Sequence, residues 1–303
     1  MTTATQPRAL GALEWPTWLT LAGCYGVWLL ATWFSAVLPL WVFLPVTILC
    51  VTLHWSLQHE ALHGHPTRSP LINEALVFPP LGLLIVFRCF RESHIRHHDD
   101  AQLTLPGIDP ESWYLPAEQL AALPAPLRLL LRINNTLAGR LVLGPAVLIV
   151  RAVADDLRRF ARCDVEIFKA YLAHAAGLAL VLWWLLAVCG IDFWFYLFAV
   201  AFPAFSLLTI RTYAEHQAAP ERGARTAIIE ASPFFALLYL NNNLHVVHHA
   251  HPGVPWYRLP RLYREDRQAY RDSNGGYGFD GYGDLFRRHL FRAKEPLAFP
   301  LER

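Results

Sequence analysis

Residues 15–59 of the chain read WPTWLTLAGCYGVWLLATWFSAVLPLWVFLPVTILCVTLHWSLQH and contain no Asp, Glu, Lys or Arg. A helix needs about 20 apolar residues to cross a bilayer, so this run of 45 residues is long enough for two crossings. Its middle, Ser35–Leu40, contains Pro39 and can turn. We therefore predict a helical hairpin in the membrane, with helices at residues 16–34 and 41–57.

A second apolar run extends from Ala170 to Ile210 and is interrupted by a single charged residue, Asp192. The residues Cys189-Gly190-Ile191-Asp192 can form its turn. We predict helices at residues 168–188 and 193–210. The alternative is a pair of buried core helices in a large soluble protein, but two paired runs of this length argue against it.

The basic residues predict how the chain is oriented. All 26 Lys and Arg residues lie outside the two apolar runs. By the positive-inside rule, the N-terminus and a helical cap formed by residues 58–167 and 211–303 are expected on the cytoplasmic side. Shorter apolar stretches at residues 71–87, 141–150 and 227–240 are expected as interfacial or cap helices. Pro79 and Pro80 argue against a continuous spanning helix in the first of them.

The composition agrees with a membrane protein. Hydrophobic residues make up 54% of the chain and charged residues 17%, against about 25% charged residues in an average soluble domain. So apolar and aromatic a chain excludes disorder, a coiled coil and collagen. The net charge of +2 is too small to suggest a nucleic acid as a partner.

The 14 histidines of the chain cluster in three boxes. Residues 59–63 form an HxxxH box, and residues 94–98 and 245–249 each form an HxxHH box. Histidines scattered at random at this frequency would give about 0.03 HxxHH matches in the whole chain. Two matches are therefore not explained by chance, nor by a solvated, pH-sensitive histidine surface.

The spacing of the boxes predicts metal binding. Positions i, i+3 and i+4 share one face of a helix, so each box can present several imidazoles together. Neutral imidazole is a good ligand for iron, zinc, copper and nickel. The boxes supply eight imidazoles, which are more than one tetrahedral ion accepts, so we expect two metal ions. The eight candidate ligands are His59, His63, His94, His97, His98, His245, His248 and His249.

Six histidines lie outside these boxes. His216, in the string Tyr213-Ala-Glu-His216-Gln, has no spacing argument and could be a ligand or an ordinary interfacial histidine. The other five are expected to be structural or to support the ligands; they are His54, His65, His174, His251 and His289.

At this point the sequence resembles the membrane fatty acid desaturase/hydroxylase superfamily. The matching strings are HEALHGH (59–65), HIRHHDD (94–100) and NNLHVVHH (242–249), in this order around two apolar hairpins. The resemblance extends from Trp15 to about Pro260 and includes bacterial acyl desaturases, alkane hydroxylases and carotenoid ketolases. It implies an all-α integral membrane protein with four transmembrane helices and a single domain over residues 1–303.

The resemblance also implies a cofactor and a reaction. Members of this superfamily hold two non-haem irons, cycling between Fe2+ and Fe3+, that activate O2 and attack an unactivated C–H bond. The family carries an isolated ligand histidine before its third box, and the string TYAEHQ (212–217) is similar to the NYxEHYG motif of alkane hydroxylases. By resemblance, His216 becomes a ninth ligand.

Polar residues near the boxes are candidates to orient the ligand rings, because ligand histidines usually donate their second ring N–H to an acceptor. The carboxylates in suitable positions are Glu60, Asp99, Asp100, Asp109 and Glu215. Asn241, Asn242 and Asn243 precede the third box; they are expected to cap its helix, or one of them to hold a metal-bound water.

The expected substrate is a lipid or acyl chain that enters from the bilayer. Because O2 chemistry of this kind consumes electrons, a separate donor is expected, either a ferredoxin, a rubredoxin or a flavoprotein reductase. The leading function is desaturation or hydroxylation of a fatty acyl chain. The alternatives are a carotenoid ketolase or hydroxylase, a fatty acid decarboxylase that forms terminal alkenes, and a desaturase of a smaller amphiphile. A membrane zinc hydrolase and a metal transporter are the alternatives from different classes.

Overall fold

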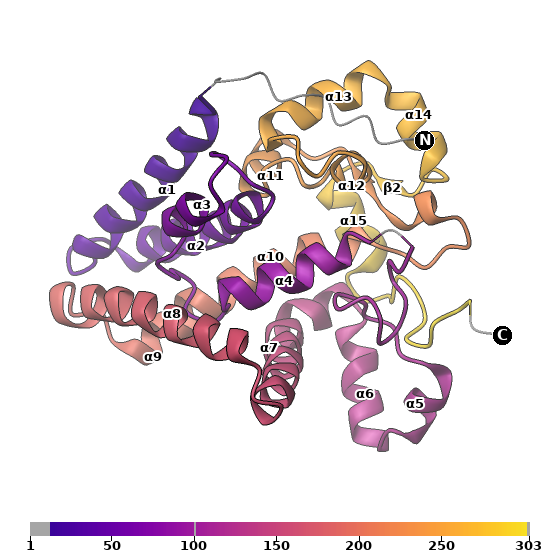
Figure 1. The fold of residues 1–303 in the computed structure, drawn as a ribbon, viewed down its shortest axis with the longest axis horizontal. Helices are drawn as coiled ribbons and strands as arrows, with labels where there is room; N and C mark the ends of the chain where they lie inside the picture. Colours follow the sequence, from indigo (N-terminus) through magenta and orange to yellow (C-terminus); the bar gives the residue numbers. More distant parts are fainter. Residues whose placement is uncertain (1–12, 100, 302–303) are drawn as a thin grey trace. The chain divides into compact units, whose positions relative to one another are not determined.

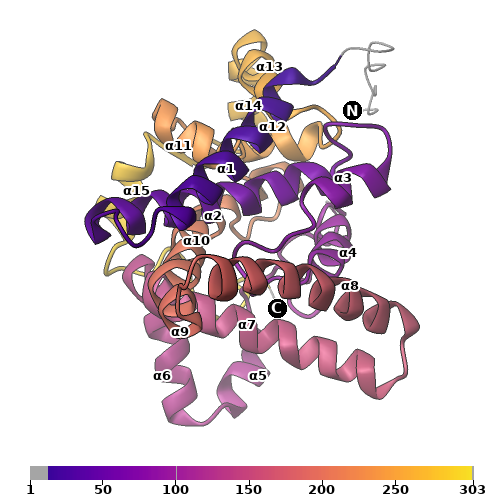
Figure 2. The ribbon, with the colours of Figure 1, turned by 90° about the vertical axis from the view of Figure 1, so that its left-hand side faces the viewer.

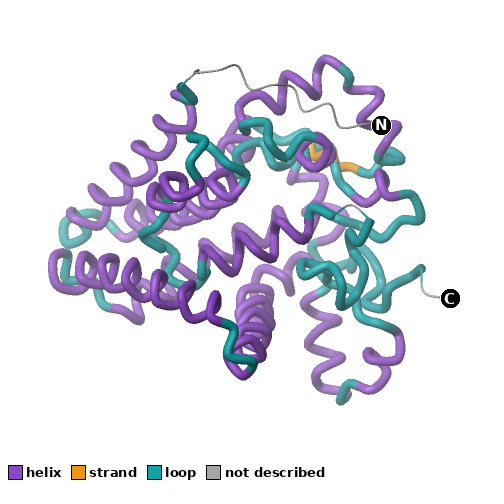
Figure 3. The backbone as a smooth tube through the Cα atoms, viewed as in Figure 1, coloured by secondary structure: helices purple, strands orange, loops and turns teal. Residues whose placement is uncertain are grey.

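The computed structural model describes residues 13–99 and 101–301, and nearly all of its regular structure is helical (Figures 1 and 3). These residues divide into two compact units. The first unit takes residues 13–91 and 146–208, and the second takes residues 92–145 and 209–301. Each unit has buried apolar residues of its own.

The first unit begins with two long helices, α1 (Trp15–Trp33) and α2 (Leu40–Leu62), which lie side by side (Figure 2). Both were predicted, but α2 continues beyond residue 57 to Leu62, so His59 is part of the helix. A short helix, α3 (Pro70–Leu76), packs on α2 and begins where the Ser69 hydroxyl accepts a hydrogen bond from the Ile72 N–H. The chain then leaves the helix before Pro79 and Pro80, as expected.

The second apolar run also forms helices close to the predicted bounds. Helix α8 (Val165–Leu182) continues into a π-helical segment, η1 (Trp183–Val188), and the chain turns at Gly190, whose φ of 67° suits glycine. The Asp192 carboxylate caps α9 (Phe193–Tyr196) by accepting from the Phe195 N–H at 2.8 Å. The helix then runs through η2 (Leu197–Ala201) into α10 (Phe202–Glu215).

Buried hydrogen bonds tie the two runs together inside the first unit. The indole N–H of Trp28 donates to the Tyr196 hydroxyl at 2.9 Å, and that hydroxyl donates to the Leu81 carbonyl at 2.9 Å. The Trp184 indole donates to the Thr32 hydroxyl, also at 2.9 Å. Because buried polar groups are costly when unpaired, these bonds fix which faces of the helices meet.

Among the described residues, four helical segments are long and apolar enough to cross a membrane: Leu40–Leu62, Leu137–Ala161, Val165–Val188 and Phe193–Glu215. Large apolar side chains on them are exposed, such as Leu172, Trp183 and Phe198, which is typical of a surface that faces lipid. Helix α1 is not one of the four, because its tryptophans, threonines and glycines lower its mean hydropathy.

Two sequence predictions of short helices were wrong. Residues 141–150 were expected as a short cap or interfacial helix, but they are the middle of α7 (Leu137–Ala161), which is 25 residues long. Arg140 lies in the first turn of this helix, where its guanidinium is buried over the Trp113 ring, 3.4 Å from the ring centroid. Residues 227–240 were expected as one helix, but residues 228–229 pair with residues 278–279 as strand β1 (Ile228–Ile229), and Pro233 stands at the first turn of a separate helix, α11 (Pro233–Leu238), a position that suits proline.

The second unit positions the histidine boxes. Strand β1 pairs in parallel with β2 (Gly278–Phe279), so that Ile228 lies opposite Gly278. Side chains from β1, α12 and α13 form a hydrophobic cluster that includes Val246, Val247 and Leu259. The remaining helical elements of this unit are α5 (Ala117–Ala122), α6 (Ala125–Asn134), η3 (Arg222–Arg225), α12 (His245–Ala250), η4 (Trp256–Arg258), α13 (Leu259–Glu265), α14 (Arg267–Ser273) and α15 (Tyr282–His289); helix α4 (Phe87–His97) has residues in both units.

Candidate metal centre

Each histidine box lies at or near the end of a helix. His59 is in the last turn of α2, and His63 is the C-cap residue of that helix. Helix α4 ends at His97, and the N–H of His98 still bonds to the His94 carbonyl at 3.2 Å. The third box is the body of α12. The helical spacing that the sequence analysis assumed is therefore present in the structure.

Four histidines of the second unit come together in what we call the four-histidine group: His97, His216, His245 and His249. Each offers a ring nitrogen, and these nitrogens lie within 4.8 Å of one another. His216 is central, because its Nε2 atom lies 2.9 Å from Nε2 of both His97 and His245. The Nε2 atom of His249 lies 3.1 Å from that of His245. His216, which lies outside the three boxes in the sequence, is thus close in space to histidines of the second and third boxes.

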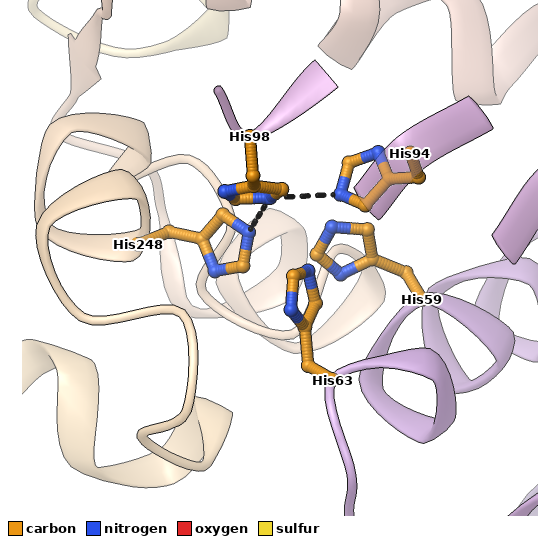
Figure 4. A group of neighbouring side chains, drawn as sticks. All are labelled: His59, His63, His94, His98 and His248. Carbon is orange, nitrogen blue, oxygen red and sulfur yellow. Dashed lines mark hydrogen bonds between the residues drawn. The ribbon is translucent and has the colours of Figure 1, made fainter. Parts of the chain in front are cut away.

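Three further histidines of the second unit form the three-histidine group: His94, His98 and His248 (Figure 4). The His98 Nε2 atom lies 3.0 Å from Nε2 of His94 and 3.1 Å from Nε2 of His248. In the first unit, His59 and His63 offer ring nitrogens within 4.8 Å of each other, and their ring centroids are 4.8 Å apart.

Each HxxHH box contributes to both groups of the second unit. In an α-helix, residue i+4 points about 40° to one side of residue i, and residue i+3 points about 60° to the other side. His94 and His98 accordingly join one group while His97 joins the other, and in α12 His245 and His249 separate from His248 in the same way. The shared spacing of the two boxes therefore places their histidines in two groups.

The rings are oriented by acceptors at their Nδ1 atoms. Nδ1 of His97 lies 2.9 Å from an Asp109 oxygen, and Nδ1 of His94 lies 2.8 Å from a Glu111 oxygen. Nδ1 of His245 lies 3.1 Å from the Asn242 side-chain oxygen, and Nδ1 of His216 lies 3.2 Å from the Arg225 carbonyl.

These contacts make Nδ1 the protonated nitrogen of a neutral ring and leave the lone pair on Nε2. In both groups of the second unit the Nε2 atoms face one another at about 3 Å, where two lone pairs repel unless a proton or a metal ion lies between them. Imidazoles anchored at Nδ1 and converging through Nε2 are a donor set that fits a transition metal.

Burial keeps most of these imidazoles neutral. It places the pKa values of His94, His98, His216 and His245 well below the usual value for histidine. His97 differs: burial lowers its pKa, but the carboxylates of Glu111, Asp109 and Glu215 outweigh burial and raise it to about 9. A bound metal ion would displace that proton, because only the neutral ring can be a ligand.

Two of the predicted supporting carboxylates do contact ligand candidates. Asp109 is buried against His97, as described above. A Glu215 oxygen lies 3.5 Å from Nδ1 of His245, accepts from the Asn242 amide at 3.2 Å and lies 2.8 Å from Nε of Arg211. Glu60 is buried on α2 next to His59 in the sequence.

Other predicted supporting residues act differently. Asp99 is exposed and accepts a hydrogen bond from the Ala101 N–H, so it turns the loop after the second box. Asp100 lies outside the described residues.

The asparagines before the third box were expected to cap its helix, and this was wrong, because Leu244 takes the N-cap position and no side chain caps it. Asn242 instead orients His245. Asn241 donates to the Trp256 carbonyl and Asn243 to the Ile229 carbonyl, which fixes the loop that leads into α12.

Sequence reasoning missed Glu111 as the partner of His94. The sequence feature that could have indicated Glu111 is its position two residues after Asp109, in the loop that follows the second box. The Asp109 side chain accepts from the backbone N–H groups of Thr104 and Glu111, so one carboxylate folds the loop that presents the other. The role of the Arg225 carbonyl had no signal in the sequence, because a backbone group carries no residue identity.

Histidines expected to be structural have other partners and belong to neither group in the described part of the chain. His65 lies 2.9 Å from Glu14, His174 lies 3.0 Å from the Leu83 carbonyl, and His251 lies 2.9 Å from the Tyr270 hydroxyl. His54 contacts the hydroxyl of Tyr25, and His289 packs on the rings of Tyr213 and Phe279.

Comparison with known proteins agrees with this arrangement. The family model of the fatty acid desaturases matches residues 35–281, which include all three boxes and His216. A comparison with curated proteins found no match. Because the family model covers most of the chain, the protein belongs to the fatty acid desaturase family, which is a family of oxidoreductases.

Proposed function

We propose that the protein is a membrane-bound diiron oxidoreductase that uses O2 to desaturate or hydroxylate an unactivated C–H position of a lipid-like substrate, such as a fatty acyl chain. The observation that carries this proposal is the convergence of Nε2 atoms in the four-histidine group of a fatty acid desaturase family member. Soft thiolate ligands would be oxidised near activated oxygen, and an all-imidazole set avoids this problem.

In this proposal each iron has its own ligand set. His97, His216, His245 and His249 would hold one iron. His94, His98 and His248 would hold the other, and His59 and His63 are proposed as iron ligands on the spacing of their HxxxH box. The irons supply the redox chemistry with O2 when they are bound. The whole chain would act as a single desaturase-like domain, multi-pass in the membrane, with its histidines on the cytoplasmic side.

The protein's own residues would keep the rings ready for the metal. Asp109, Glu111, Asn242 and the Arg225 carbonyl would accept the Nδ1–H protons of His97, His94, His245 and His216, so the Nε2 atoms of these four rings stay directed at the other histidines. Burial keeps the imidazoles of His94, His98, His216 and His245 neutral near pH 7, whereas His97 would lose its extra proton when a metal ion binds.

The electron balance requires a partner. Desaturation removes two hydrogens from the substrate and, with O2, two electrons and two further protons, gives two waters; hydroxylation gives one water and an alcohol. In both cases the two electrons come from outside the chain. We propose a ferredoxin, a rubredoxin or a flavoprotein reductase as the donor, and no nucleic acid as a partner.

The test is lipid profiling of cells that express the wild-type protein, the His97→Ala or His248→Ala variant, or a control with a histidine from outside the groups replaced, His289→Ala. We expect a new unsaturated or hydroxylated lipid in wild-type and control cells, and none with the two ligand variants although they still insert in the membrane. Wild-type activity in either ligand variant would contradict the proposal. A ketolated carotenoid or a terminal alkene would identify a different substrate or outcome within the same class. Hydrolysis or metal uptake without O2 consumption would refute it.

A further inference from the structure

The structure around His216 shows how this isolated histidine is held. Helix α10 ends at Glu215, so the carbonyls at its end have no donor from the next helical turn. The Tyr277 hydroxyl donates to the Ala214 carbonyl at 2.7 Å, and the ammonium of Lys294 donates to the His216 carbonyl. A cation at the C-terminal end of a helix also interacts favourably with the helix dipole.

Glu295, the residue after Lys294, contacts the backbone on the C-terminal side of His216. The N–H of Ala218 lies 3.0 Å from a Glu295 carboxylate oxygen and 2.8 Å from the Tyr114 hydroxyl. Lys294 and Glu295 therefore bind the carbonyl of His216 and the N–H two residues later. These contacts all lie within the second unit.

Lys294 is unusual for a lysine because it is nearly buried, with 11% of its side chain exposed. Its Nζ atom donates to the Tyr277 hydroxyl at 2.6 Å and lies 5.2 Å from the centroid of that ring. Its backbone N–H donates to the Tyr213 hydroxyl at 3.1 Å. Burying an ammonium group is costly unless it is well paired, and the bonds to the His216 carbonyl and the Tyr277 hydroxyl supply that pairing.

A small displacement of His216 would change two contacts of its group at once, because its Nε2 atom lies 2.9 Å from Nε2 of both His97 and His245. We infer that Lys294 is a positioning residue which, from the C-terminal segment, fixes the backbone of His216 and so completes the four-histidine group. This inference rests on the proposed role of His216 as a metal ligand. Lys294 acts through His216 and is not itself a ligand.

The experiment is a Co2+ titration of the purified full-length protein, followed by its visible absorption, for the wild type and the Lys294→Met variant. The matched control is Lys169→Met, which replaces the chain's other lysine, an exposed residue paired with Glu166. We expect the wild type and the control to bind two Co2+ ions. In Lys294→Met, one of the two ions should bind about 10-fold more weakly, with altered absorption bands, because residues that orient ligands contribute about 10–100-fold to metal affinity.

Two more variants keep the inference testable. Lys294→Arg keeps a cation and should recover most of the lost affinity. If Lys294→Met does not fold, Tyr277→Phe removes only a hydroxyl and should weaken the same site. Wild-type affinity at both sites, or equal weakening of both sites, would overturn the positioning role. Fewer than two Co2+ ions in the wild type would instead overturn the proposed function.

Discussion

Replacing Asp109 by Asn tests whether an oriented imidazole is needed for metal binding. One oxygen of the buried Asp109 carboxylate lies 2.9 Å from both Nδ1 of His97 and the Glu111 N–H, and the other accepts from the Thr104 N–H at 2.7 Å. An Asn side chain has one acceptor oxygen, which can replace only one of the two carboxylate oxygens. Its NH2 group must then face the donor that the other carboxylate oxygen had bound.

The expected cost follows from the bonds lost. In Asp109→Asn, the amide oxygen should take the place that faces His97 and the Glu111 N–H, and the Thr104 N–H should lose its acceptor. Loss of one buried hydrogen bond to a charged group costs about 1.5–3 kcal/mol of stability. Removing the charge next to His97 should also weaken metal binding about 10–100-fold, which corresponds to about 1.4–2.8 kcal/mol.

The assay is competition with a chromophoric chelator for the metal, together with thermal unfolding of the metal-free protein. The control is Asp99→Asn, an exposed carboxylate nearby in the sequence, which should change metal affinity by less than twofold and stability by at most about 0.5 kcal/mol. Wild-type metal affinity in Asp109→Asn would refute the idea that the carboxylate prepares His97 for the metal.

Three further substitutions test the fold and the extent of the site. A Cβ atom added at Gly139 in α7 would lie 1.8 Å from the Ile133 carbonyl oxygen, so Gly139→Ala should lower the free energy of unfolding by about 2–3 kcal/mol, measured by chemical denaturation. At Gly283 in α15 the added Cβ meets no atom within 4 Å beyond its chain neighbours and the backbone of its own helix, so Gly283→Ala should be neutral or stabilise by up to about 1 kcal/mol, and a large loss there would contradict the packing described. His289→Ala should cost about 1 kcal/mol of aromatic packing and leave the metal content unchanged; loss of metal would place His289 in the site.

Much of the candidate site could be predicted because its signals are local. The HxxHH spacing sets the directions of the imidazoles on one helix turn, and the apolar runs set the helices on either side. The division of each box between two groups was not predicted, because it depends on which face of α4 and of α12 meets its neighbours. Glu111, the Arg225 carbonyl and Lys294 act across loops and distant segments, so their roles follow from tertiary contacts.

Helix α7 shows how a local rule can fail. The apolar stretch at residues 141–150 suggested a short helix, but α7 extends from Leu137 to Ala161, and the Trp113 ring and the Asn134 carbonyl receive the Arg140 guanidinium inside the protein. Trp113 and Arg140 are far apart in the sequence, so a local sequence pattern does not show that they are in contact. The same holds for residues 228–229, whose apolar pattern fits a helix until the pairing with residues 278–279 is known.

The most direct test of the central claim is iron analysis with Mössbauer spectroscopy of the full-length protein, purified from cells grown with 57Fe. We predict two irons per chain in the wild type, in a spectrum typical of a coupled pair after oxidation. Replacing His245, which belongs to the four-histidine group, by Ala should remove at least one of them. A single ion, bound zinc in place of iron, or two irons that survive the loss of His245 would contradict the account.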